Sequence, residues 1–211
     1  MHKTNLKTKL KLDTVKNQIV AKVINTDANT VLLRNLAHVQ VKDLSIVFYI
    51  PTASAETLIT NAILHDWHIS LDELFVLAMN NTQKFFPAII SPTSSILSSD
   101  SLNRLMEWTG FGKNELWHLY HHNDSVISSS YGAISIFYGN MLEKLYKRVR
   151  GPFYVLPFDI HSLMIVPKNE ERLCALQRFV YSLSLMTPSA DLLSDSVYEF
   201  DGEKFNIAEY E

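Results

Sequence analysis

The hydrophobic and polar positions of the first half of the chain follow two different periods, and each period predicts its own kind of element. Residues 44–50 are apolar or aromatic at nearly every position, which is typical of a strand buried on both faces. Residues 71–81 carry apolar side chains at helical spacing, and Ser70 and Glu73 form a capping-box pattern at the start of this segment. The pattern therefore predicts a buried strand and, further along, a well-capped helix.

Two further helices are predicted in this half. Ser54 is placed to cap the first, which runs to about Trp67, and Ser99 or Asp100 is placed to cap the second. The segment 91–101 combines proline with a cluster of hydroxyl residues, which is typical of a connecting loop. The sequence leaves open whether that loop is ordered.

The second half alternates short strands with two amphipathic helices. Asn140 and Asn169 are placed to start the helices, and residues 157–160 are few enough to join two strands as a hairpin. Lysines and arginines at the end of the first helix suit the negative end of its dipole, so they need no ligand to explain them. The strands are predicted over residues 131–138, 153–156, 161–166 and 196–200.

Together these elements predict an α+β fold rather than a regular doubly wound one. A mainly helical half over residues 19–125, with one buried strand, precedes a sheet-containing half over residues 126–211 with the order β-α-β-β-α-β. We expect residues 19–211 to form a single domain. If the strand at 44–50 joins the later sheet, the two halves share one core. Residues 1–18 form a basic segment that we expect to be frayed.

Composition and charge narrow the function classes. The chain has 211 residues, of which 47% are hydrophobic, so it can bury a sizeable core. A formal net charge of −3 argues against a nucleic-acid partner held mainly through phosphates. The single cysteine, Cys174, excludes an internal disulfide and falls on a predicted apolar stripe, where an inert core thiol is expected. With no long apolar run and no secretory signal, we expect a soluble, cytoplasmic protein without a membrane partner.

Histidines supply the densest cluster of potential metal ligands. His118 and His122 stand one turn apart on a predicted helix, and His65 and His68 could complete a coordination set. The alternative is a solvated helix end, which the sequence favours because no zincin-type glutamate lies between the pair, so no metal is expected. Nucleotide-binding loops and calcium loops are missing from the sequence as well, and we therefore expect no cofactor.

The predicted hairpin holds the remaining candidates for chemistry. His161, with Asp159 and Ser162 nearby, offers the residue types of a hydrolytic site, although no nucleophile elbow is present. The alternative is structural, with His161 satisfying backbone groups of the turn. The candidates for a binding surface on the same hairpin are Leu156, Pro157, Phe158, Asp159 and His161.

A series of short segments, in a fixed order, resembles a known bacterial family. The segments are Val23-Ile24-Asn25, Asn29 and Leu32-Leu33, residues 41–49, Trp67 before residues 69–74, residues 78–82, Gly132-Ala133, residues 154–157, Ile160-His161 and residues 193–198. As a set they resemble the family catalogued as domain of unknown function 5688. The resemblance covers about residues 19–201, and no single segment would carry it.

The resemblance implies a bacterial, cytoplasmic protein or one encoded by a mobile element, because the family is associated with Gram-positive anaerobes. It implies no activity. In the family the hairpin usually resembles Leu-Pro-Ser-Ser-x-His-Glu, and only Leu156, Pro157 and His161 match it here. If relatives use those hydroxyls and that glutamate as a catalytic unit, this chain lacks the unit, and Asp159 substitutes only in part.

Two hypotheses from different classes follow. The first is a non-catalytic binding or regulatory protein, with another protein as partner, that uses a surface around the hairpin and the serine-rich loop. The second is a hydrolytic or metal-assisted enzyme centred on His161. The sequence favours the first, because it contains no complete catalytic constellation.

Overall fold

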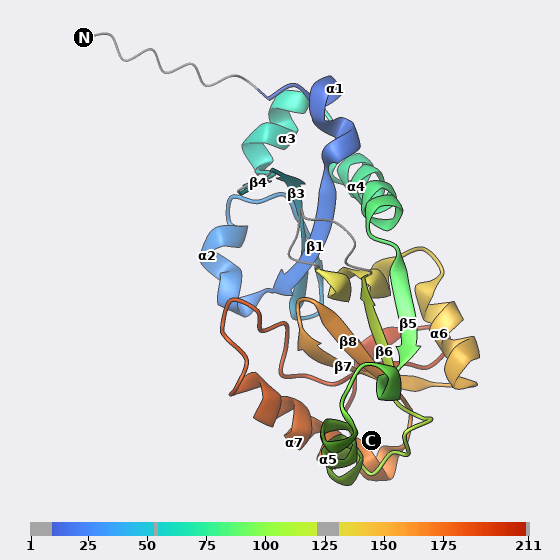
Figure 1. The fold of residues 1–211 in the computed structure, drawn as a ribbon. Helices are drawn as coiled ribbons and strands as arrows, with labels where there is room; N and C mark the ends of the chain where they lie inside the picture. The colour runs from blue at the N-terminus through green and yellow to red at the C-terminus, as the bar shows by residue number, and fades with distance from the viewer. Residues whose placement is uncertain (1–9, 53–54, 122–130, 210–211) are drawn as a thin grey trace.

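Two antiparallel sheets, one above the other in Figure 1, organise this computed structural model, which describes residues 10–52, 55–121 and 131–209. The first sheet has the order β1-β3-β2, and β4 also pairs with β3. The second has the order β10-β9-β7-β8-β6-β5. The strands are β1 (Val20–Asn25), β2 (His38–Val41), β3 (Leu44–Pro51), β4 (Glu56–Leu58), β5 (Ala88–Pro92), β6 (Trp117–His121), β7 (Phe153–Asp159), β8 (Ser162–Pro167), β9 (Tyr198–Phe200) and β10 (Phe205–Ile207).

Helices cover the two sheets and close both ends of the molecule. Figure 1 places α3 and α4 beside the first sheet, and α5 and α7 together at the far end of the second, near the C-terminus. The α-helices are α1 (Leu12–Val15), α2 (Thr30–Leu33), α3 (Asn61–Trp67), α4 (Leu71–Phe85), α5 (Ser99–Thr109), α6 (Met141–Val149) and α7 (Leu173–Ser184). Short 3-10 helices are η1 (Lys16–Gln18), η2 (Asp27–Asn29), η3 (Thr93–Ser95), η4 (Gly132–Phe137) and η5 (Glu170–Arg172).

The α+β class is confirmed, but the prediction of a mainly helical first half with one strand is wrong. β1 to β6 all precede residue 122, and β5 and β6 belong to the second sheet. β1 was not predicted as a strand because its buried positions are Val20, Ala21, Val23 and Ile24. This spacing suits a helix as well as a strand. Strand pairing, which the local sequence does not encode, decides between the two.

β3 confirms the prediction of a strand buried on both faces. Leu44 to Ile50 are all buried, and alternate side chains enter different clusters. Ile46 and Phe48 join the main core, whereas Val47 on the opposite face packs in a smaller cluster with Ile24 and Leu58. β3 lies in the first sheet and not in the later one, yet the main core draws side chains from both sheets.

The helix predictions succeed where capping signals are local. At α4 the Ser70 hydroxyl accepts a hydrogen bond from the Glu73 N–H, and the Ser70 N–H donates to the Glu73 carboxylate, which completes the capping box. α5 is present too, although Ser98 caps it rather than Ser99 or Asp100. Both predicted asparagine starts precede helical turns, but neither Asn140 nor Asn169 makes a side-chain cap hydrogen bond.

The predicted helix from Ser54 to Trp67 is shorter than expected. α3 begins only at Asn61, where the Thr60 hydroxyl accepts a hydrogen bond from the Ile63 N–H, and Ser54 lies outside the described residues. The preceding segment pairs with β3 as β4, because an open strand edge satisfies its backbone groups. The predicted serine-rich loop 91–101 is also largely ordered, since parts of β5, η3 and α5 occupy it.

The strand predicted over residues 131–138 is wrong, because Gly132–Phe137 form the 3-10 helix η4. η4 is buried along most of its length and contacts strands of both sheets. Gly132 makes this position possible, because a Cβ there would lie 2.1 Å from the His161 carbonyl oxygen and 2.8 Å from the His121 nitrogen. A segment with strand-like composition is thus held as a helical turn by close backbone contact with β6 and with the β7–β8 turn.

The predicted hairpin is present as β7 and β8. The expected last strand is present as β9, which lies between β7 and β10 and so is not at an edge. Cys174 is exposed on α7, contrary to the prediction of a core thiol, because the buried stripe runs through Leu173, Leu176 and Val180 instead.

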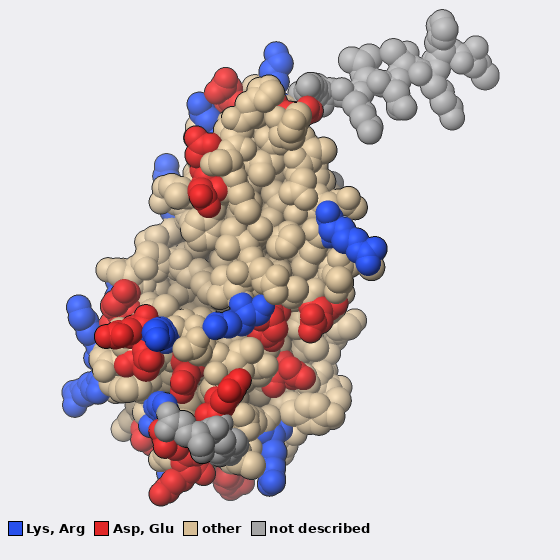
Figure 2. Space-filling model, turned by 180° about the vertical axis from the view of Figure 1, so that it is seen from behind, with Lys and Arg blue, Asp and Glu red and all other residues tan. Residues whose placement is uncertain are grey.

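The surface charge is mixed, and the described helices are not of the membrane-spanning kind. On the face shown in Figure 2, cationic and anionic side chains are interspersed, and the described residues drawn there form no extended basic surface. No helix in the described ranges combines the length and apolar character that crossing a bilayer requires.

Candidate functional site

The β7–β8 turn positions His161, the centre of the sequence-based predictions. Asp159 Oδ1 accepts hydrogen bonds from the backbone N–H groups of His161 at 2.7 Å and Ser162 at 3.0 Å. The pairing register of the two strands shifts between Pro157 and Asp159, so the turn carries a bulge. Asp159 therefore holds the turn through the backbone, and one of its oxygens is committed to that task.

The carboxylate nearest the His161 ring is that of Asp191, whereas the sequence had pointed to Asp159. His161 Nε2 lies 3.9 Å from Asp191 Oδ1, and about two fifths or less of either side chain is exposed. Asp191 lies in the segment after α7. Its backbone carbonyl oxygen accepts a hydrogen bond from the Ile160 N–H at 3.0 Å. Of the proposed binding residues, Leu156 and Pro157 are buried, and the Phe158 side chain lies outside the described part of the chain.

A cleft of about 260 Å³ opens beside His161. Its floor is the outer face of the first sheet, because Lys22 and Ile24 of β1 share a face, and Val47 of β3 joins them. The complete lining is Lys22, Ile24, Asn29, Leu32, Val47, Leu58, Tyr131, Ile160, His161, Ala190 and Asp191. Segments far apart in the sequence therefore converge on one concave surface.

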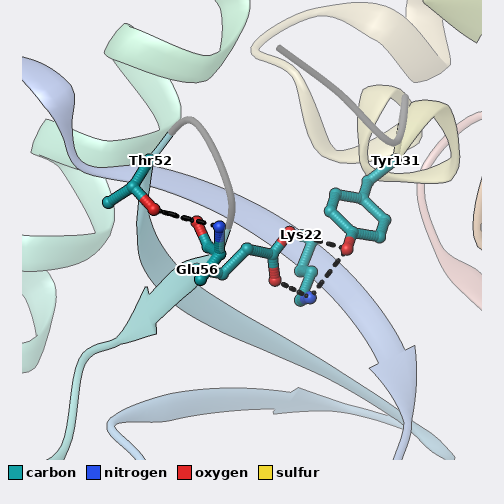
Figure 3. Close-up of polar contacts among 5 residues, drawn as sticks. Lys22, Thr52, Glu56 and Tyr131 are labelled. Carbon is teal, nitrogen blue, oxygen red and sulfur yellow. Dashed lines mark hydrogen bonds and ion pairs between the residues drawn. The ribbon is translucent and has the colours of Figure 1, made fainter.

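Two side chains that line the cleft, Lys22 and Tyr131, form a closed set of contacts with Glu56 behind them, and we call these three residues the cleft network (Figure 3). Lys22 Nζ lies 2.5 Å from Glu56 Oε2 and donates to the Tyr131 hydroxyl at 3.1 Å. The Tyr131 hydroxyl donates to Glu56 Oε1 at 2.7 Å. The Lys22 and Glu56 side chains are 13% and 26% exposed, so water screens this ion pair only partly.

Aromatic rings surround the cation of the cleft network. Lys22 Nζ lies 4.2 Å from the centre of the Tyr131 ring and 5.2 Å from that of Tyr49. The His161 ring stacks against Tyr131, with ring centres 6.0 Å apart and planes 12° from parallel. Burial and the negative charge of Glu56 raise the pKa of Tyr49, so this phenol stays neutral.

Contacts between Thr52 and Ala55 hold the start of β4, where Glu56 lies. The Thr52 hydroxyl donates to the Ala55 carbonyl oxygen at 2.6 Å and accepts from the Ala55 N–H at 3.1 Å (Figure 3). The hydroxyl thus holds Thr52 and Ala55 together, and β4, which begins at Glu56, runs antiparallel to β3. Glu56 thus enters the cleft network from a strand that the sequence did not predict.

The proposed histidine metal site loses its structural premise. His118 lies on β6, a strand, so it is not one helical turn from His122, which lies outside the described residues. His65 and His68 lie at the end of α3, with ring centres 6.2 Å apart. Within residues 10–52, 55–121 and 131–209, no group of three or more histidine, cysteine or acidic residues is arranged to hold a metal.

A buried histidine that the sequence reasoning passed over has a clear structural role. His121 Nε2 and the Tyr138 hydroxyl lie 2.8 Å apart, and the His121 ring lies between the rings of Phe86 and Tyr138, nearly parallel to both. Tyr138 also donates to the Phe86 carbonyl oxygen at 3.1 Å. Burial lowers the pKa of His121 to about 4, so the imidazole is neutral at pH 7.

His118 behaves in the same way. Burial lowers its pKa, although the charge of Asp159 opposes the shift. Its ring also meets that of Tyr120 edge-on, at 6.1 Å. His118 and His121 therefore belong to the interior beside the second sheet rather than to a solvated helix end.

Sequence reasoning missed most of the cleft. Lys22 gives one local signal, because it is a lone charge in the apolar run of residues 19–24. Glu56, Tyr131 and Asp191 give none, since their importance comes from contacts with distant segments. Glu56 and Tyr131, for example, are 75 positions apart.

Segments that carry the family resemblance meet in the folded chain. Asp43, in the β2–β3 turn, accepts hydrogen bonds from the Ser194 hydroxyl at 2.6 Å and the Tyr198 hydroxyl at 2.7 Å. The Thr82 hydroxyl of α4 accepts from the Ala21 N–H of β1 at 2.8 Å. These contacts tie the first sheet to the second and to α4, which is a structural use of those segments.

Comparison with known proteins agrees with this resemblance. A family model described as a family of unknown function, DUF5688, matches residues 1–202. No curated protein and no solved structure matches the chain. Because the match spans nearly the whole sequence, the chain belongs to the DUF5688 family.

Proposed function

We propose that this protein is a non-catalytic binding protein of the bacterial cytoplasm and that the cleft beside His161 receives a short segment of another protein. The carrying observation is the cleft network, in which Lys22, Glu56 and Tyr131 satisfy one another. Acid–base or nucleophilic catalysis needs such groups aimed at a substrate instead. Here they build a fixed polar wall, which suits recognition.

The size and lining of the cleft support a protein segment as the ligand. At about 260 Å³ the cleft is smaller than the range of about 300–1,000 Å³ that is usual for cofactor and drug-sized ligands. Ile24, Leu58 and Ile160 offer an apolar wall for one side chain. Asn29 and Asp191 line the same cleft and can pair with the backbone of the bound segment.

A displayed library of random peptides tests this proposal without a known partner. The library is selected on the wild-type protein, and the enriched peptides are then measured against Ala190→Arg, which fills the cleft, and Ala62→Arg on α3. Both alanines are exposed, so neither change disturbs the core. We expect Ala190→Arg to weaken binding by at least about tenfold, which corresponds to about 1.4 kcal/mol, and Ala62→Arg to leave it unchanged.

Two results would contradict the cleft as the binding site. The first is that no peptide is enriched over an uncoated support. The second is that the enriched peptides bind both variants equally well. In the second case the protein still binds peptides, but through another surface.

A hydrolytic enzyme centred on His161 is the second candidate. The observation that favours it is the approach of His161 Nε2 to Asp191, at 3.9 Å, beside an open cleft. A panel of activated esters and peptide substrates tests it directly. Turnover that the wild type shows and His161→Ala loses would establish this candidate and remove the first.

A further inference from the structure

β10 is the open edge of the second sheet. Within the described part of the chain it pairs only with β9, and the sheet ends there. In an antiparallel pair, residues whose backbone groups bond across the ladder alternate with residues whose groups point away from it. The Ala208 N–H donates to the Val197 carbonyl oxygen at 2.8 Å. At the other end of the strand the Asp201 N–H donates to the Lys204 carbonyl oxygen at 3.4 Å, and the two bonds together fix the alternation along β10.

This alternation directs four backbone groups of β10 outward. Asn206, opposite Glu199, occupies a bonded position, so its N–H and C=O face β9. Phe205 and Ile207 lie between bonded positions, so the N–H and C=O of each point to the open edge. Among the described residues, no hydrogen bond from outside the sheet reaches these four groups. An extended segment laid along β10 can therefore form main-chain hydrogen bonds with all four of them.

A pocket of about 540 Å³ lies beside this edge. Asn206, Glu199 and Tyr154 stand opposite one another on β10, β9 and β7, so their side chains share one face of the sheet. Tyr154 and Leu173 of α7 are buried there and give the pocket an apolar wall. In an added strand, the residue opposite Asn206 turns its side chain to this same face, and hence to the pocket.

The charges around the pocket favour a long basic side chain. The charged lining residues are Glu170, Glu199, Glu209, Lys42 and Lys168, so three carboxylates face two ammonium groups. Lys168 Nζ lies 3.1 Å from Glu199 Oε2 and 3.6 Å from Glu170 Oε1, so two of the carboxylates share this one cation. The stem of an arginine or lysine can lie along the apolar wall while its charged end meets the carboxylates.

We infer that the β10 edge binds an extended segment of another protein as a seventh strand of the second sheet, with an arginine or lysine opposite Asn206. The pocket shares no lining residue with the cleft beside His161, so the inference does not depend on the proposed function. A second copy of this chain is a poorer occupant, because pairing two β10 edges would bring together two pockets with the same excess charge.

A displayed library of heptapeptides with a fixed central arginine and random flanks tests the inference. The library is selected on the wild-type chain, and the enriched peptides are measured against variants by fluorescence polarisation. Ile207→Pro removes an outward N–H and leaves the ladder with β9 intact, whereas the matched control Ile207→Val keeps that N–H. We expect binding to Ile207→Pro to be weaker by at least about tenfold and binding to Ile207→Val to change by less than about twofold.

Changes in the peptide test the register on the wild-type protein. N-methylation of the two residues beside the central arginine removes the donors that pair with Phe205 and Ile207, so it should weaken binding by at least about tenfold. N-methylation of the arginine itself should have little effect, because its N–H points away from β10. Replacing the arginine with glutamate should weaken binding by at least about tenfold.

The controls separate this site from the alternatives. Circular dichroism establishes that each variant is folded, and if Ile207→Pro does not fold, the N-methylated peptides decide the question. Ala190→Arg, which fills the cleft, should leave binding unchanged, and peptides that only this variant loses would overturn the inference. No enriched peptide, equal binding to Ile207→Pro, or equal binding of the glutamate peptide would overturn it too. So would a wild-type dimer in sedimentation velocity that Ile207→Pro abolishes, since a second copy would then occupy the edge.

Discussion

The molecule uses similar polar side chains in two different ways, in its interior and at the cleft. The inner cluster consists of His121, Tyr138 and the Phe86 carbonyl group, and both side chains are almost fully buried and neutral. The cleft network instead keeps the Lys22–Glu56 ion pair near water. Buried polar groups without partners are costly, whereas partly hydrated ones can exchange partners. The comparison indicates that the inner cluster contributes more to stability than the cleft network does.

Gly132→Ala should have the largest effect, because Gly132 lies where both regions meet. The new Cβ would overlap the backbone of His161 and His121, which cannot move without displacing the β7–β8 turn and β6. We expect the free energy of unfolding to fall by about 3 kcal/mol or more, measured by urea denaturation.

Gly112→Ala is the matched control for this substitution. A Cβ at Gly112 meets only the flexible Glu115 carboxylate, at 3.2 Å. We expect it to change stability by less than about 1 kcal/mol. Equal effects at the two glycines would show that backbone contact around η4 does not limit the fold.

The inner cluster should also make stability depend on pH. The pKa of His121 is about 4 in the folded protein against 6.5 for the free side chain, so between these values only the unfolded chain binds the proton. The contribution of His121 is therefore complete above pH 6.5 and is lost as the pH falls toward 4. At about 1.4 kcal/mol per pKa unit, the loss is about 3 kcal/mol.

Urea denaturation of the wild type and His121→Phe between pH 4 and 7.5 isolates this dependence. Other groups titrate equally in both proteins, so the difference between the two curves reports His121. We expect the wild type to lose more stability than the variant as the pH falls. Parallel curves would mean that His121 takes up its proton in the folded state as readily as in the unfolded one.

Local signals account for what could be predicted from the sequence, and long-range pairing accounts for the rest. The capping box at Ser70 and the hairpin of β7 and β8 depend on neighbouring residues, and both were predicted, although the turn lies at residues 160–161 and not at 157–160. β6 was misassigned as a helix end because pairing with both β5 and β8 defines it. The cleft network could not be predicted for the same reason. Its residues lie on β1, on β4 and directly before η4, and only the folded chain brings these elements into contact.

Removing the Tyr138 hydroxyl of the inner cluster should lower the free energy of unfolding more than removing the Tyr131 hydroxyl of the cleft network. Tyr138→Phe leaves the Phe86 carbonyl group and His121 Nε2 without the hydroxyl that joins them, and the His121 and Tyr138 side chains are almost fully buried. We expect a loss of about 2 kcal/mol in the free energy of unfolding. The pKa of Tyr138 is raised by burial, so the wild-type phenol stays neutral at the pH of the measurement.

Tyr131→Phe makes the same change in the cleft network and should have the smallest effect. The ring that stacks on His161 remains, and the Lys22–Glu56 pair still holds both charges together without the hydroxyl. Water can also reach this edge of the cleft and replace the lost hydrogen bonds, so we expect a loss of at most about 1 kcal/mol. Paired urea denaturation of the two Tyr→Phe variants at pH 7 measures the difference. If Tyr131→Phe proves as costly as Tyr138→Phe, the cleft network is part of the stabilising interior, and the proposal that it forms a binding wall loses its physical basis.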